Sequence, residues 1–273
     1  MAIPFSQNVT EALAYSNSSL KTFSNWLLTI LMTVLVVFGV LVTVCGISLI
    51  TASAFLAGIP ESFSIIATII SVFCETLVEI FNAFTSSLMT AGIILTVVGI
   101  IVTALFSFWL TGVMVRGASP EEVTLAKPGK LLGQGFFANI IMLVYFIPAI
   151  ILSIIICLGP MDNEIYFALV GIIVQGLIYC LCGMAGYMAI AAYANEGRLG
   201  AAFSIPSVCS AITRFGWLRF LGHFLLFSLL AYVVLMIIAI IPIIGLLLLL
   251  FAVPFLEVLT GRFFGNIYRS VQA

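Results

Sequence analysis

The stretch WLLTILMTVLVVFGVLVTVCGISLITASAFL, residues 26–56, contains no Asp, Glu, Lys or Arg side chain. A helix needs about 20 predominantly apolar residues to cross the hydrocarbon core of a bilayer, so this stretch is long enough to span. It is also too long for the apolar region of a cleavable signal peptide. We therefore expect it to stay attached as the first transmembrane helix.

The composition of the whole chain extends this prediction. Of its 273 residues, 64% are hydrophobic and only 7% are charged, whereas a soluble globular domain carries about 25% charged residues. A chain so poor in charge cannot cover a water-facing surface, which excludes a soluble fold. The net charge of −1 offers no basic patch for phosphates, so nucleic acid is not an expected partner.

Five further apolar runs have the length of spanning helices, giving six in total. Within the fourth span, residues 182–192 are rich in Gly and Ala. Small side chains let helices approach closely in a membrane, so this span is predicted to pack centrally. The six spans are predicted at residues 26–56, 88–115, 136–158, 165–193, 220–240 and 243–264.

A seventh apolar stretch, residues 61–84, differs because Glu75 and Glu79 interrupt it. Residues four apart share one helix face, so the pattern favours an amphipathic helix in the membrane interface. The alternative is a seventh span. The acidic pair is interpreted as the wet face of that helix; the other reading is an outer-face site that binds a cation or closes a vestibule.

The distribution of Lys and Arg supports six spans. Cytoplasmic loops are enriched in these residues, and with six spans all nine fall on one side of the membrane. Seven spans would move Lys21 to the opposite side. The sequence therefore predicts a cell-membrane protein with both termini in the cytoplasm.

The predicted fold class is all-α: a polytopic membrane helical bundle of about six transmembrane helices, arranged as three hairpins with interfacial helices. An N-terminal interfacial segment covers 1–25. The first hairpin covers 26–115 with the amphipathic insertion at 61–84. The second hairpin covers 116–193, and the third, with a short tail, covers 194–273.

Several motifs from Lys127 onward resemble a family of multi-pass membrane proteins. They are PGKLLGQG at 128–135, LVYFIP at 143–148, YANEGRLGAAF at 193–203, and IPIIG at 241–245 followed by Pro254-Phe. This prokaryotic, largely archaeal family is catalogued as a domain of unknown function. The resemblance covers the chain from about Lys127 to the C-terminus, and it implies the architecture without any activity.

Three polar residues of the last hairpin form the candidate site. Counted from Ile241, Glu257 is 16 residues along one arm and His223 is 18 along the other, so their depths agree within about 3 Å. Arg219 is one turn nearer the cytoplasm. We predict that Glu257 pairs with His223 or Arg219, either to fix the hairpin register or as a proton- or ligand-binding site, since ionisable residues in spans are costly.

The sequence contains no nucleotide-binding loop, zinc motif or nucleophile signature, and His223 is its single histidine. We therefore expect no cofactor, no metal and no enzymatic activity. The leading prediction is a structural or accessory membrane component whose partners are the lipid bilayer and other membrane subunits. The alternative is a transporter or permease with a binding site near Glu257. A polar cavity around Glu257 would favour transport, and a solid apolar bundle would favour the accessory role.

Overall fold

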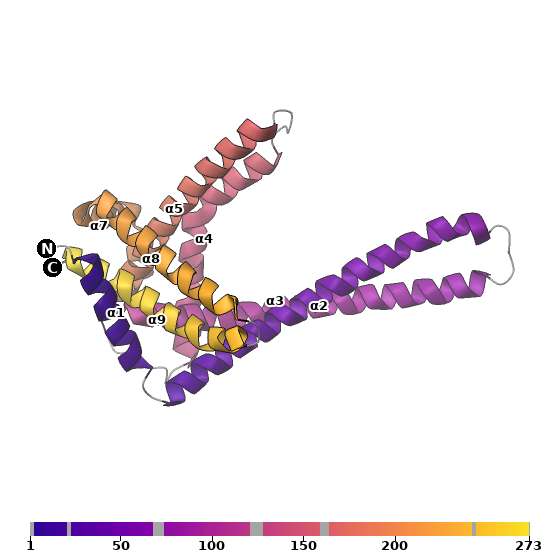
Figure 1. Ribbon diagram of the computed structural model, residues 1–273, viewed down its shortest axis with the longest axis horizontal. Coiled ribbons are helices and arrows are strands. Elements are labelled where there is room, and N and C mark those ends of the chain that lie inside the picture. The colour runs from indigo at the N-terminus through magenta and orange to yellow at the C-terminus, as the bar shows by residue number, and fades with distance from the viewer. Residues whose placement is uncertain are drawn as a thin grey trace. The chain divides into compact units, whose positions relative to one another are not determined.

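The computed structural model describes residues 3–20, 23–67, 74–120, 128–158, 164–241 and 244–272, and the elements within these ranges are helices (Figure 1). This confirms the all-α prediction, which follows because only helices and closed barrels satisfy their backbone groups in lipid. The helices are α1 (Phe5–Ser19), α2 (Phe23–Ala67), α3 (Cys74–Ala118), α4 (Pro128–Leu158), α5 (Glu164–Glu196), α6 (Leu199–Phe203), α7 (Ile205–Phe215), α8 (Trp217–Ala239) and α9 (Ile244–Gln272).

Six of the described helices are long and apolar enough to cross a membrane, as predicted. Each falls on one of the six apolar runs identified in the sequence. The candidate spans are Leu27–Ala54, Asn82–Ala118, Pro128–Ile156, Ile173–Glu196, Trp217–Ile238 and Leu248–Gln272.

The amphipathic helix over residues 61–84 stays a prediction, because residues 68–73 lie outside the described residues. Helix α2 continues to Ala67, and α3 already begins at Cys74. Each has 45 residues, about 68 Å at 1.5 Å per residue, which is more than twice the thickness of the hydrocarbon core. Extending an existing helix costs far less than nucleating a new one. The described residues of this stretch therefore continue α2 and α3 instead of forming a helix of their own. Glu75 and Glu79 thus lie in the first turns of α3, and their side chains fall outside the described residues.

The chain forms two compact units, one of residues 32–107 and one of residues 1–31 with 108–273. The first unit is the hairpin of α2 and α3, whose contact is made by glycines and threonines. A Cβ atom on Gly39 would lie 2.6 Å from Oγ1 of Thr103, and one on Gly99 would lie 2.5 Å from the backbone nitrogen of Thr43. Small side chains are what allow two membrane helices to approach this closely.

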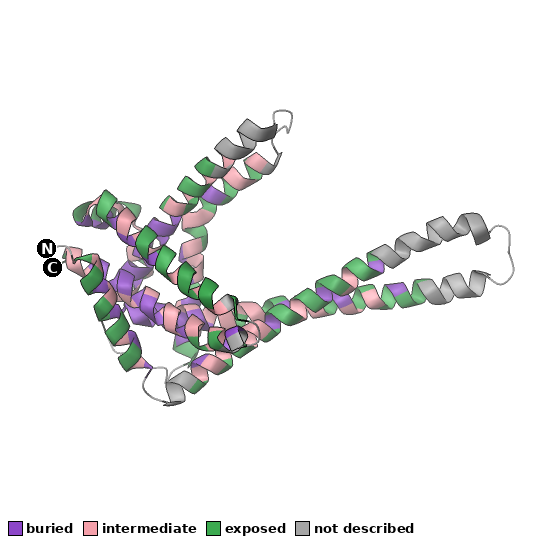
Figure 2. Cartoon of the chain, viewed as in Figure 1, coloured by how far each residue is buried: buried purple, intermediate pink, exposed green. Residues whose placement is uncertain are grey.

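The second unit holds the larger core. The small residues of α5, including Ala189 and Ala191, are fully buried, so α5 is a central helix as predicted. In Figure 2 the buried residues concentrate where α5 and α9 meet, while the outer face of α8 is exposed. The largest fully buried side chains of the second unit include Trp109, Met184, Met188, Ile212, Phe220 and Phe263.

Two short helices, α6 and α7, precede the span of α8, in agreement with the predicted entry segment of the third hairpin. In α7 the apolar side chains of Val208, Ile212 and Phe215 are buried, while the hydroxyl groups of Ser207 and Ser210 are exposed. Gly216, with φ of 100°, joins α7 to α8. That left-handed backbone favours glycine because it has no Cβ atom.

The two ends of the chain lie together in this unit (Figure 1). Nδ2 of Asn8 in α1 donates to the carbonyl of Phe263 in α9 at 3.2 Å, and Nδ2 of Asn266 donates to Oδ1 of Asn8 at 3.1 Å. Helix α1 is therefore fixed along the C-terminal half of α9 by buried hydrogen bonds.

Candidate functional site

Among the described residues, the structure shows no ion pair or hydrogen bond between Glu257 and His223 or Arg219. His223 is buried, and its Nδ1 atom lies 2.8 Å from the carbonyl oxygen of Arg219 within α8. Its ring makes edge contacts with Phe5 and Phe215, at centroid distances of 5.4 and 5.2 Å. The predicted ion pair is absent among these described residues, and this correction separates His223 from the Glu257 site.

The reason is the way in which the two arms of the hairpin pack. His223 and Phe227 face Phe263, and the Phe227 and Phe263 rings are stacked 4.4 Å apart. Phe263 is six residues beyond Glu257, a rotation of roughly 120° around the helix and a shift of about 9 Å along it. The aromatic contact therefore sets the register, and it turns Glu257 toward a different set of helices.

This arrangement predicts that His223 is a packing residue. Replacing His223 with Phe keeps an aromatic ring among Phe5, Phe215 and Phe263 and loses one hydrogen bond within the helix. Volume-conserving swaps and single hydrogen bonds each change stability by about 1 kcal/mol. We expect the free energy of unfolding in detergent to change by no more than about 1 kcal/mol, as measured by thermal unfolding with circular dichroism. A loss of stability well above this value would contradict the packing role.

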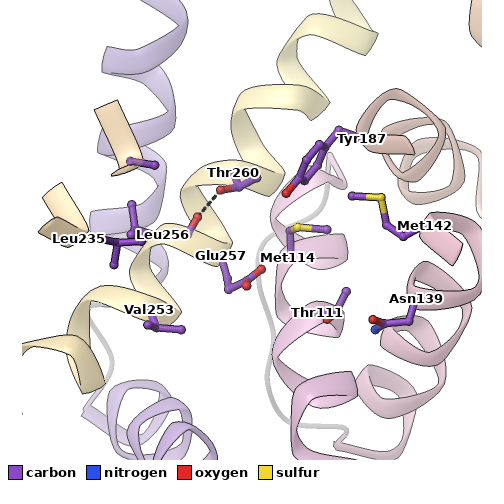
Figure 3. Close-up of a pocket in the computed structure, with 11 residues that line it drawn as sticks. Thr111, Met114, Asn139, Met142, Tyr187, Leu235, Val253, Leu256, Glu257 and Thr260 are labelled. Carbon is purple, nitrogen blue, oxygen red and sulfur yellow. Dashed lines mark hydrogen bonds between the residues drawn. The ribbon is translucent and has the colours of Figure 1, made fainter. Parts of the chain in front are cut away.

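Glu257 lines a cavity of about 340 Å³ inside the second unit (Figure 3). Five helices contribute to its wall, and most of the lining side chains are apolar. The lining residues are Thr111 and Met114 of α3, Asn139 and Met142 of α4, Tyr187 of α5, Ala231 and Leu235 of α8, and Val253, Leu256, Glu257 and Thr260 of α9.

Polar groups from separate helices converge on this space. In Figure 3 the Glu257 carboxyl points from α9 toward α3, and the Asn139 amide points from α4 toward Thr111. Nδ2 of Asn139 donates to the carbonyl of Gly135 at 2.8 Å, which leaves the amide oxygen to accept a further hydrogen bond. The phenol of Tyr187 points toward α9. The cavity therefore offers hydrogen-bond acceptors on three sides.

The electrostatics of the cavity are set by one group. Glu257 is the only residue among those lining it that can carry a full charge at neutral pH, since none is Lys, Arg, His or Asp. Within the described part of the chain, its carboxyl has no hydrogen bond and no ion pair. An uncompensated carboxylate is costly away from water, so this site favours a proton or a positively charged partner.

An aromatic layer closes the cavity toward the C-terminal end of α9. Tyr187, which lines the cavity, stacks on Phe264 with ring centroids 4.8 Å apart and planes 14° from parallel. Phe264 in turn makes edge contacts with Phe220 and Phe263. Phe220 and Phe263 are fully buried, so the Tyr187 ring is held by a packed aromatic cluster.

A second polar cluster joins the ends of α3, α5 and α9, and sequence reasoning missed it. The Arg269 guanidinium donates to the carbonyl of Ala118 at 2.7 Å, to Oδ1 of Asn195 at 3.1 Å and to Oδ1 of Asn266 at 2.6 Å. Arg262 donates to the carbonyl of Ser119 at 3.1 Å. The two arginines thus cap the last carbonyls of α3 and compensate its dipole. The only signal in the sequence was the placement of Asn and Arg within an apolar helix.

The described residues contain no group of three His, Cys, Asp or Glu side chains placed to hold a metal ion. Residues 113–244 match the family described as "Protein of unknown function (DUF4013)". No curated protein and no solved structure matches the chain.

The family match agrees with the predicted resemblance to a domain of unknown function. It begins ahead of Lys127 and ends within the last hairpin, whereas the predicted resemblance ran to the C-terminus. The matched region includes the last residues of α3, from Val113 onward, and all of α4, α5 and α8. It does not include Glu257. Together with the six candidate spans, this match over just under half of the chain fits a multi-pass membrane protein of unknown activity.

Proposed function

We propose that this protein is a membrane transporter that binds a small polar solute in the cavity around Glu257. The observation that carries the proposal is the cavity of about 340 Å³ with an unpaired carboxyl in its wall. Ligand sites occupy about 300–1,000 Å³ and combine mostly apolar walls with a few convergent polar groups. A solid apolar bundle would have favoured the structural or accessory role, which now becomes the second candidate.

The depth of the site supports transport. Glu257 lies 13 residues after the start of α9 at Ile244, about 20 Å along the helix and so within a 30 Å hydrocarbon core. Secondary transporters bind their substrates inside the membrane, near its midplane.

The local backbone adds a second argument. Pro254 lies inside α9, three residues before Glu257. Proline has no backbone N–H group, so the carbonyl of Leu250 has no normal helical partner. Pro254 therefore removes one backbone hydrogen bond about one turn from Glu257, within a helix that runs unbroken from Ile244 to Gln272.

For the topology we propose that both termini are cytoplasmic, in a prokaryotic cell membrane. The hydrogen bonds between α1 and α9 support a common side for the two ends. The concentration of Lys and Arg on that side supports the cytoplasm. Lipid and other membrane subunits stay the proposed partners.

The proposal is tested by screening for solutes that bind and by filling the cavity with a larger side chain. Purified protein in detergent is screened by thermal unfolding against small ammonium, carboxylate and neutral solutes, because a ligand at 100 times its Kd stabilises a protein by about 2.7 kcal/mol. We expect at least one solute to raise the Tm of the wild type, and Ala231→Trp, which places an indole in the cavity, to abolish that rise. Uptake of the same solute into proteoliposomes should be lost in parallel.

A matched control comes from the same helix. Leu229 is 58% exposed and does not line the cavity, so Leu229→Trp should bind and transport like the wild type. Ala231→Leu, a smaller filling, should give a partial loss. If no solute stabilises the wild type, or if Ala231→Trp binds normally while folded, the transport proposal fails.

A further inference from the structure

Resting on the proposed function, we propose that the solute is an organic monocation and that it exchanges with one proton at the Glu257 carboxyl. The sign of the charge follows from the residues that face Glu257. From α3 these are Thr111 and Met114, from α4 Asn139 and Met142, from α5 Tyr187, and from α8 Ala231 and Leu235; Val253, Leu256 and Thr260 are its neighbours on α9.

Tyr187 is the only other titratable group in that set, and a neutral phenol cannot balance a carboxylate. The wall therefore carries at most one negative charge and no positive charge. An anionic solute would be repelled by it, and a divalent cation would stay half-neutralised. A single positive charge matches the site.

The rest of the wall selects an organic cation over a bare metal ion. Metal cations such as Mg²⁺ require about six oxygen ligands at close range. The described wall offers one carboxyl group and one amide oxygen around a cavity of about 340 Å³, which is much larger than a metal ion. The ring of Tyr187 and the thioethers of Met114 and Met142 line the same space. Aromatic faces attract quaternary ammonium groups, and thioethers pack adaptably against apolar groups.

The exchange follows from the cost of leaving the carboxylate bare. In an empty cavity the carboxyl is neutralised by its own proton, because a buried and unpaired carboxylate is costly. When a cation enters, the O–H bond of the carboxyl breaks, the proton passes to water, and the carboxylate becomes the counter-ion of the bound cation. One positive charge replaces another, so the net charge of the site stays constant.

This inference is tested with benzyltrimethylammonium chloride, a permanent cation that carries no exchangeable proton. Binding to the purified chain is followed by titration calorimetry in buffers with different ionisation enthalpies, which counts the protons released. We expect about one proton per bound cation, and an affinity that falls about tenfold for each pH unit on the acid limb of the profile. Because the probe has no exchangeable proton, any proton that the buffer takes up must come from the protein.

Variants of Glu257 show whether its carboxyl is the group that releases the proton. Glu257→Gln should release no proton and bind the probe at least about tenfold more weakly, whereas Glu257→Asp should still release one. Glu11, which is exposed on α1 and bonded to Gln7, provides the matched control, and Glu11→Gln should behave like the wild type. If Glu257→Gln does not fold, the proton count of the wild type still decides.

The outcomes separate this inference from the proposed function. Binding of the probe without proton release, or unchanged binding in Glu257→Gln, overturns proton exchange. Binding of neutral or anionic solutes in a cavity that Ala231→Trp blocks, with no binding of the ammonium probe, overturns the choice of a cation and leaves transport standing. If no solute binds, the proposed function itself fails.

Discussion

Replacing Gly135 with Ala will force α3 and α4 apart and lower the free energy of unfolding by about 3 kcal/mol or more. A Cβ atom on Gly135 would collide with the carbonyl oxygen of Phe108, and it would lie 2.7 Å from the backbone nitrogen of Gly112. Both obstacles are backbone atoms, so no side-chain rotation can relieve the clash. Overpacking of a well-packed contact costs about 1–3 kcal/mol, and occasionally more.

The control lies on the same helix. Gly133 is two residues away, and a Cβ atom there would meet nothing within 4 Å. Gly133→Ala should therefore be neutral, or more stable by up to about 1 kcal/mol, because alanine is the better helix former. Thermal unfolding of both variants in detergent micelles measures the difference. Equal stability of the two would show that α3 and α4 do not approach each other at Gly135.

The spans and the all-helical class could be predicted because the bilayer imposes them. Charge-free runs of about 20 residues and satisfied backbone groups leave few alternatives. The central position of α5 could also be predicted from the sequence, since its Gly and Ala residues allow close contacts with other helices. These properties depend on neighbouring residues in the sequence and on the solvent, so one chain is enough to infer them.

The partner of Glu257 could not be predicted in the same way. Counting residues from Ile241 gives the depth of Glu257 and His223, but it leaves the rotation and tilt of each helix open. In the structure the stacking of Phe227 on Phe263 decides these, and His223 faces the aromatic side while Glu257 faces the cavity. Depth without rotation predicted a pair of Glu257 and His223, and the described residues show no ion pair between them.

The cavity itself was predictable only as an alternative. It needs Thr111, Asn139, Tyr187 and Glu257 from four helices to meet, and no local pattern indicates such a meeting. Tertiary packing, rather than periodicity, therefore decides whether the cavity forms.

The polar cluster at Arg269 gives the second prediction with a large expected effect. Arg269→Met keeps an unbranched apolar stem but removes the donors to Ala118, Asn195 and Asn266. Hydrogen bonds to charged groups contribute about 1.5–3 kcal/mol, and a buried acceptor left without a donor adds its desolvation cost. We expect a loss of about 3 kcal/mol or more, measured as unfolding by sodium dodecyl sulfate in mixed micelles. Arg269→Lys should recover only part of it, because one ammonium group cannot reproduce the planar guanidinium fork.

Arg198 supplies the comparison that makes this prediction specific. Its side chain is 81% exposed and lies 3.7 Å from Glu196, and exposed ion pairs contribute only about 0.2–1 kcal/mol. Arg198→Met removes the same charge from the same end of α5, so a general effect of net charge or detergent binding would appear equally in both variants. If the two shifts are equal and below about 1 kcal/mol, the ends of α3, α5 and α9 are not joined through Arg269. If Arg269→Met alone is destabilised, the cluster is what fixes α9, and with it the position of Glu257, against the end of α3.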